Sequence, residues 1–240
     1  MMTRLIHLTV LLLMGLWLLP VTGVHAHHLW LTQNREGLGV ARGTLPDEQE
    51  PYRPAAVVEA AAWDPAGQPL ALTRQDLADR VRFQTVGPAA IATVRCDWGL
   101  RVNTTEGKKL IGRREAESQG LTVIDGFFST QFSKTIFSDG PLTTVPTGLL
   151  LEIVLLDNPL TIPAEQPVKV QVLFEQRPLA DATVHFGKRR QARTDADGVA
   201  VMEVQGTAGE LIWARHQVAV TDDPEKNYIL YTTFLVLSGQ

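Results

Sequence analysis

Three of the chain's six histidines stand within four residues, in the stretch Val24-His25-Ala26-His27-His28-Leu29. Imidazole nitrogens are donors that nickel, copper, cobalt and zinc accept in proteins. If the chain is cut after Ala26, His27 becomes the N-terminal residue and offers an α-amine as well as an imidazole, and His28 adds a second imidazole. We therefore predict a transition-metal site that includes His27 and His28.

The residues before this stretch have the pattern of a secretion signal. Arg4 gives a positive start, residues 5–19 are almost entirely apolar, and residues 24–26 have the small or tolerated types found at cleavage sites. The apolar run is shorter than the roughly 20 residues of a comfortable membrane span. We predict that residues 1–26 are a signal peptide and that the periplasmic product has no transmembrane segment. A cut after Gly23, or an uncleaved anchor, are the alternatives.

Composition narrows the classes of partner. The chain has 22 basic and 26 acidic residues, a net charge of -4, which disfavours nucleic acid as a partner because phosphate contacts need a basic surface. Cys96 is the only cysteine, so no intramolecular disulfide supports the fold. We predict that Cys96 is buried and inert.

Short apolar segments and frequent turn residues predict a mainly all-β fold. We expect an N-terminal β-rich domain over residues 27–147 and an immunoglobulin-like β-sandwich over residues 148–240. The stretch Gly140–Gly148 is rich in proline, glycine and threonine and is predicted to connect them.

Two local predictions concern the first of these domains. Residues 80–86 and 89–98 read as strands separated by Gly87-Pro88, which predicts a hairpin. Phe128, Phe132 and Ile136 recur every four residues, and this spacing predicts an amphipathic helix within residues 125–139.

His216 is the candidate that could complete a metal site with His27 and His28. Strand alternation over residues 210–220 places it on the same face as Ile212 and Ala214, so it should point inward. A core histidine hydrogen-bonded to a backbone carbonyl and a buried neutral metal ligand are both compatible with this position. His185 falls on the other face of its own strand, toward solvent.

Several short pieces of the second half carry a family resemblance. They are Leu151-Glu152-Ile153-Val154, Asn158-Pro159, Val172-Leu173-Phe174, Pro178-Leu179-Ala180, Thr194-Asp195-Ala196-Asp197-Gly198 and Trp213-Ala214-Arg215-His216. Together with the start His27-His28-Leu29-Trp30-Leu31, they resemble the NikM-like family of exported bacterial proteins. Members of that family are periplasmic components related to the uptake of nickel or cobalt, and the family was formerly classed only as a domain of unknown function. The resemblance implies a periplasmic location, a nickel or cobalt ion, and an inner-membrane transporter as partner.

The sequence therefore predicts a periplasmic protein that binds nickel or cobalt, with copper as a further fit to the same donors. No nucleophile elbow, phosphate-binding glycine loop or HExxH motif is present, and we expect no enzymatic activity. One alternative is a metal-free exported module that binds a protein or a glycan. Another is an oxidative copper enzyme that uses His27 as a brace.

Overall fold

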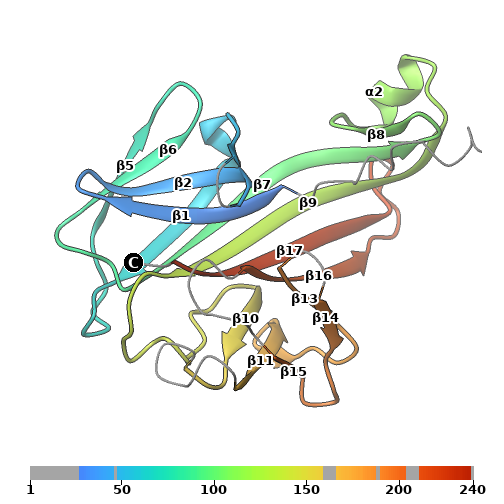
Figure 1. The fold of residues 1–240 in the computed structure, drawn as a ribbon. Coiled ribbons are helices and arrows are strands. Elements are labelled where there is room, and N and C mark those ends of the chain that lie inside the picture. Colours follow the sequence, from blue (N-terminus) through green and yellow to red (C-terminus); the bar gives the residue numbers. More distant parts are fainter. Residues whose placement is uncertain (1–26, 46–47, 159–165, 188–189, 204–210, 239–240) are drawn as a thin grey trace, which may run out of the picture.

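The computed structural model describes residues 27–45, 48–158, 166–187, 190–203 and 211–238. The predicted signal peptide, residues 1–26, lies outside the described residues. The fold is nearly all β, as predicted, and three sheets form its layers (Figure 1). Among the described helices, none has the length and apolar character needed to cross a membrane.

The central sheet has eight strands in the order β14-β13-β16-β17-β9-β7-β4, with β8 paired to β7. Neighbouring strands are antiparallel except β17 and β9, which run parallel from Tyr228 opposite Phe127 to Leu237 opposite Ile136. The strands are β4 (Val57–Trp63), β7 (Ile91–Thr104), β8 (Gly107–Lys109), β9 (Val123–Ile136), β13 (Thr183–Phe186), β14 (Arg190–Arg193), β16 (Leu211–Ala219) and β17 (Tyr228–Leu237).

A five-stranded N-terminal sheet covers one face of the central sheet, which we call the N face. Its strands are β1 (His28–Asn34), β2 (Gly37–Thr44), β3 (Glu48–Gln49), β5 (Leu72–Asp76) and β6 (Val81–Thr85). Leu29 and Leu31 on β1 are buried in the hydrophobic core that also contains Trp98 and Phe234 of the central sheet. Cys96 lies in the same core, and burial raises the pKa of its thiol, as expected for an inert cysteine.

A four-stranded C-terminal sheet covers the opposite face, the C face. It consists of β10 (Leu151–Leu155), β11 (Pro167–Phe174), β12 (Arg177–Pro178) and β15 (Val199–Glu203). The boundary expected at residues 147 and 148 falls in the connection between β9 and β10. Strands from both sides of that boundary form the central sheet, so the two halves share one layer.

Both local predictions in the first half are wrong. β6 pairs with β2 and β5, and the Gly87-Pro88 turn carries the chain from the N-terminal sheet to the central sheet instead of closing a hairpin. Residues 123–136 form the strand β9 instead of a helix. Phe128, Phe132 and Ile136 are an even number of residues apart, so their spacing fits one side of a strand as well as one side of a helix.

The central sheet extends past the outer sheets as an arm, residues 99–129 and 217–230, with β8 and the short helix α2 (Arg113–Ser118) at its tip (Figure 1). The ladder between β7 and β9 shifts register between Asp97 and Gly99, where the arm begins. Gly99 has a φ of +79°, a conformation that glycine adopts without strain. The arm is therefore a continuation of the sheet beyond a β-bulge.

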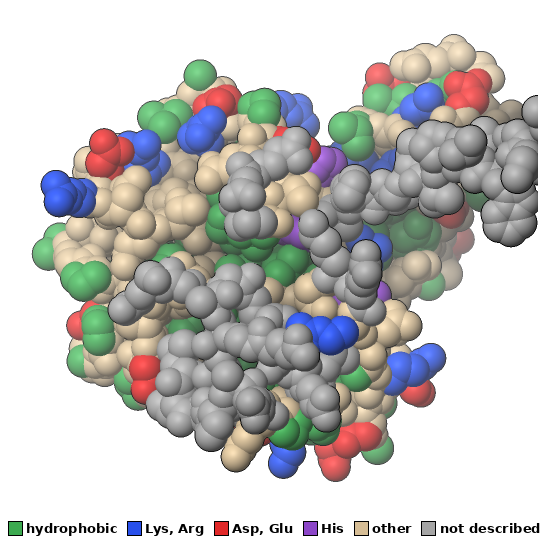
Figure 2. Space-filling view, in the orientation of Figure 1, with side chains coloured by type: hydrophobic (Ala, Val, Ile, Leu, Met, Phe, Trp, Pro, Cys, Tyr) green, Lys and Arg blue, Asp and Glu red, His purple; other side chains and the backbone are tan. Residues whose placement is uncertain are grey.

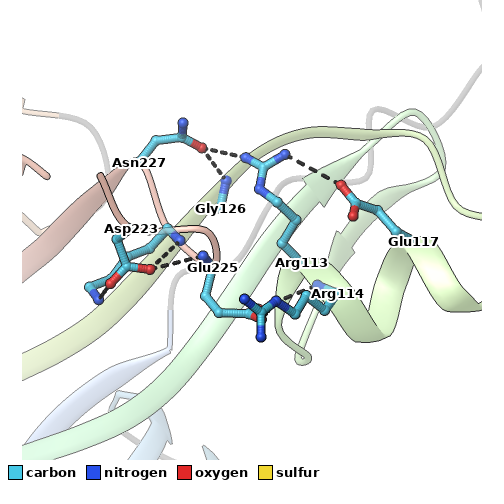
Figure 3. A network of polar contacts seen from close by, with 8 residues as sticks. Arg113, Arg114, Glu117, Gly126, Asp223, Glu225 and Asn227 are labelled. Carbon is cyan, nitrogen blue, oxygen red and sulfur yellow. Dashed lines mark hydrogen bonds and ion pairs between the residues drawn. The ribbon is translucent and has the colours of Figure 1, made fainter. Parts of the chain in front are cut away.

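A polar network fixes the tip of the arm (Figure 3). Arg113 of α2 and the backbone N–H of Gly126 both donate to the side-chain oxygen of Asn227, and Arg114 pairs with Glu225 at 3.3 Å. A Cβ on Gly126 would lie 2.4 Å from the Glu225 carbonyl oxygen, so only glycine lets the β16–β17 turn approach this closely. The network holds α2 and that turn together.

Candidate functional site

His27 makes a specific polar contact at the beginning of the described chain. Its Nε2 lies 2.6 Å from Oε1 of Glu50, and Oε2 of Glu50 accepts a hydrogen bond of 2.7 Å from Arg42. The His27 carbonyl accepts a hydrogen bond of 3.5 Å from Gln131 of β9, on the N face. Because Nε2 engages a carboxylate, Nδ1 is the ring nitrogen that keeps a lone pair in the neutral imidazole. Nδ1 is also the nitrogen nearer the residue's own backbone nitrogen.

His28 is placed differently, although it is the next residue. Its Nδ1 accepts a hydrogen bond of 3.2 Å from the backbone N–H of Leu45, and its ring lies edge-on to Phe234 with 5.9 Å between centroids. In a neutral ring whose Nδ1 accepts, the proton is on Nε2. Metal binding by His28 would therefore require the Leu45 hydrogen bond to break.

His216 lies on the C face, as the alternation of β16 predicted. Its ring packs against Phe174 of β11 at a centroid distance of 4.4 Å. Burial lowers the pKa of His216, and the nearby Glu175 carboxylate opposes that shift. The central sheet separates His216 from His27 and His28, so the structure does not bring the three together. Within the described ranges, no group of three or more His, Cys, Asp or Glu side chains is arranged to hold a metal ion.

His185 is the histidine that shares the N face with His27 and His28. Its ring stacks on Trp213 at 3.7 Å and 4°, and Trp213 is in register with Phe234, the ring beside His28. Burial lowers the pKa of His185, and the Arg215 guanidinium lowers it further. His185 therefore lies on the face of the central sheet opposite to that of His216. Strand alternation predicted that its ring points to solvent, but the ring stacks on Trp213.

The partners of His27 were not found from the sequence. Glu50 follows two other acidic residues in a polar stretch, which gives no reason to single it out. Gln131 comes from a segment more than 100 residues away. Only the pairing of β1 with β2 and the packing of β1 on the central sheet bring these groups to the start of the described chain.

Comparison with known proteins gives one match. Residues 24–210 match the family described as Domain of unknown function (DUF4198), a span that contains His27, Glu50 and His185 and ends before His216. No curated protein and no solved structure matches the chain. Since the match covers most of its length, the chain belongs to the DUF4198 family of domains of unknown function.

Proposed function

We propose that this chain is an exported, periplasmic transition-metal-binding protein that chelates its metal with His27. Cleavage after Ala26 would give His27 a free α-amine, which together with Nδ1 offers two nitrogen donors from one residue. The observation that supports this is the 2.6 Å contact between His27 Nε2 and Glu50. Imidazoles that ligate metals generally donate their other ring N–H to a carboxylate or carbonyl, which fixes the tautomer and orientation.

The surrounding residues suit this role. Arg42 holds the second oxygen of Glu50, so the carboxylate is positioned before any metal binds. Two nitrogen donors of intermediate softness fit nickel, cobalt or copper. We favour nickel or cobalt, and an inner-membrane transporter as the recipient, because of the resemblance to the NikM-like proteins. A site with two protein donors leaves other coordination positions open to water or to a partner's ligands, which suits transfer of the ion.

A metal-free interaction module is the second candidate. A cleft of about 400 Å³ lies between the C face and residues 147–150. Trp63, Phe132, Arg95 and Glu175 are among its lining residues. Aromatic surface with a few charged groups at the rim is the usual lining of a small-ligand site, and a glycan or peptide segment would suit it.

The test of the metal proposal begins with the mass of the processed N-terminus. The purified protein, freed of metal with a chelating resin, is then titrated with nickel, cobalt and copper. We expect tight binding of at least one ion, weakened about 10- to 100-fold by Glu50→Gln through loss of the orienting partner. His27→Ala should weaken it at least as much. One alanine added before His27 should do the same, because it keeps the imidazole and removes the free amine. His216→Ala is the matched control and should bind normally.

Two results would contradict the proposal. One is that the intact processed protein binds none of the three ions better than micromolar. The other is a mature N-terminus that does not begin at His27. Either result would leave the metal-free module as the favoured function. Binding of glycans or peptides at the C-face cleft would then be compared between the parent protein and an Arg95→Gln variant, because Arg95 lines the cleft and is partly exposed.

A further inference from the structure

Positive charge gathers on the N face where the arm leaves the body of the molecule, and Figure 2 shows Lys, Arg and His side chains in this region. We call the cluster the basic patch and define it by three cations and three rings: Arg101, Lys108, Arg215, Phe127, Trp213 and Tyr228. The register of the central sheet brings them to one face. Arg101 lies opposite Phe127, and Phe127 lies opposite Tyr228. Arg215 lies opposite Thr232, and Thr232 lies opposite Gln131, which is four residues from Phe127 on β9 and thus on the same face.

Two of the three cations of the basic patch, Lys108 and Arg215, lie over aromatic rings. Nζ of Lys108 is 5.7 Å from the centroid of the Phe127 ring, and that ring stacks on Tyr228 at 5.2 Å and 3°. The Arg215 guanidinium lies 4.8 Å from the centroid of Trp213. These contacts orient the charged groups without neutralising them.

None of the three cations forms an ion pair with a carboxylate of the described part of the chain. Arg101 donates a 2.9 Å hydrogen bond to the Leu100 carbonyl, which carries no net charge. Neighbouring cations do pair: Lys109 lies 3.7 Å from Glu106, and Arg95 lies 2.9 Å from Asp97. The Asp125 carboxylate adjoins the patch, where it accepts hydrogen bonds from Tyr228 and Asn103 and forms no ion pair with the three cations. The excess of positive charge in a chain of net charge -4 is therefore a local property of this face.

The pKa values of Lys108 and Arg101 are lowered, as expected where burial and neighbouring cations act together. Burial lowers the pKa of Lys108, and the positive charges of Arg215 and Arg101 lower it further, although solvent still reaches the lysine. Burial lowers the pKa of Arg101 as well, with Arg42 and Arg53 acting in the same direction. Cations that repel one another in a partly dehydrated place are stabilised by an anion.

We propose that the basic patch binds a small organic anion that carries two or more carboxylate groups. Guanidinium groups match carboxylates with two parallel hydrogen bonds, and the carbon skeleton of the anion needs space beside them. Beside Arg215, a cleft of about 360 Å³ lined by Trp213, His185 and Thr183 gives such a skeleton room. This inference goes beyond the proposed function, because it needs neither a metal ion nor a free α-amine.

Calorimetric titration of the full processed protein with citrate tests the inference. Metal is first removed with a chelating resin, and inorganic phosphate and glycerol are titrated as an anion without a carbon skeleton and a neutral polyol. We expect citrate to bind at least about tenfold more tightly than phosphate, glycerol not to bind, and added salt to weaken citrate. Arg101→Gln and Arg215→Gln should each weaken citrate about tenfold or more, the effect of losing one charged hydrogen bond.

Matched variants separate this site from the others. Arg82→Gln removes an arginine of the N-terminal sheet that pairs with Glu36, and it should leave citrate binding unchanged. His27→Ala should also leave it unchanged, so that failure of the metal proposal and failure of this one are told apart. Equal affinity for phosphate and citrate, or normal citrate binding by Arg101→Gln and Arg215→Gln with native circular dichroism, would overturn the proposal.

Discussion

The two faces of the central sheet differ in whether their charged side chains are paired within the chain. On the C face, Lys134 and Glu152 are buried, with exposed fractions of 1% and 0%, and Nζ lies 3.5 Å from Oε1. Lys134 also donates to the Val145 carbonyl at 2.8 Å, and Glu152 accepts backbone N–H groups from Thr147 and Gly148. On the N face, the cations of the basic patch have no carboxylate partner among the described residues. Charge satisfied within the chain stabilises the fold, whereas charge left unbalanced at a surface is available to a ligand.

The histidines repeat this contrast. Both rings are half-buried, but His216 on the C face packs against Phe174, while His27 at the N face meets the Glu50 carboxylate. From the sequence alone, both residues are predicted to belong to one metal site. Their separation by the sheet assigns them different roles: packing for His216 and, in our proposal, chelation for His27.

The largest effect is expected from breaking the charge pair of the C face. Glu152→Gln would leave the buried Lys134 ammonium without its counter-charge and would turn an amide N–H₂ toward backbone donors. Removing one partner of a buried pair costs about 3–5 kcal/mol, and we expect the free energy of unfolding in urea to fall by that amount. Glu106→Gln, which breaks the surface pair with Lys109, is the control and should show no measurable change. A loss below about 1 kcal/mol for Glu152→Gln would show that the pair is not structural.

A smaller effect should follow from titrating His216. Burial lowers its pKa in the folded protein below the ordinary value of 6.5. Above pH 6.5 the ring is neutral in both states and stability is complete. As pH falls below 6.5, the unfolded chain takes up the proton first, so stability declines until the folded pKa is passed. His216→Gln should therefore lose less stability than the parent protein between pH 7 and the acid range, measured by urea unfolding at each pH. His185→Gln should change the slope in the same direction, because burial lowers that pKa too. If stability depends on pH as steeply in both variants as in the parent protein, or more steeply, the pKa values of His216 and His185 are not lowered in the folded protein.

Local sequence pattern predicted the fold class and the face of one strand, but it did not predict the type of every element or the order of strands in the sheets. Alternation along β16 placed His216 on the correct face, and short apolar segments between turn residues predicted the nearly all-β fold. The four-residue spacing of Phe128 and Phe132 could not distinguish helix from strand, because it satisfies both periods. Sheet order was out of reach, since the pairing of β17 with β9 joins segments about 100 residues apart.

The sites depended on the same non-local information. His27 meets Glu50 because β1 and β2 pair and the chain then returns through β3. Arg101 and Arg215 have no relation in sequence, and the register of four strands alone brings them to one face. The histidines could be singled out from the sequence, because imidazole is itself a metal ligand. The relevant carboxylates and cations could not be singled out, because their roles depend on which residues the fold places beside them.

The smallest effect on stability should come from neutralising the basic patch. Arg215→Gln removes a cation that has no carboxylate partner among the described residues and whose charge lowers the pKa of Lys108. Losing its contact with Trp213 costs a little, and relief of the repulsion offsets that loss. We expect the free energy of unfolding to change by less than about 0.5 kcal/mol, and any gain to appear at low salt and vanish as salt screens the charges. Urea unfolding at two salt concentrations measures this. A loss comparable to that of Glu152→Gln would show that Arg215 stabilises the fold. The two faces would then not differ in how their charged groups contribute to stability.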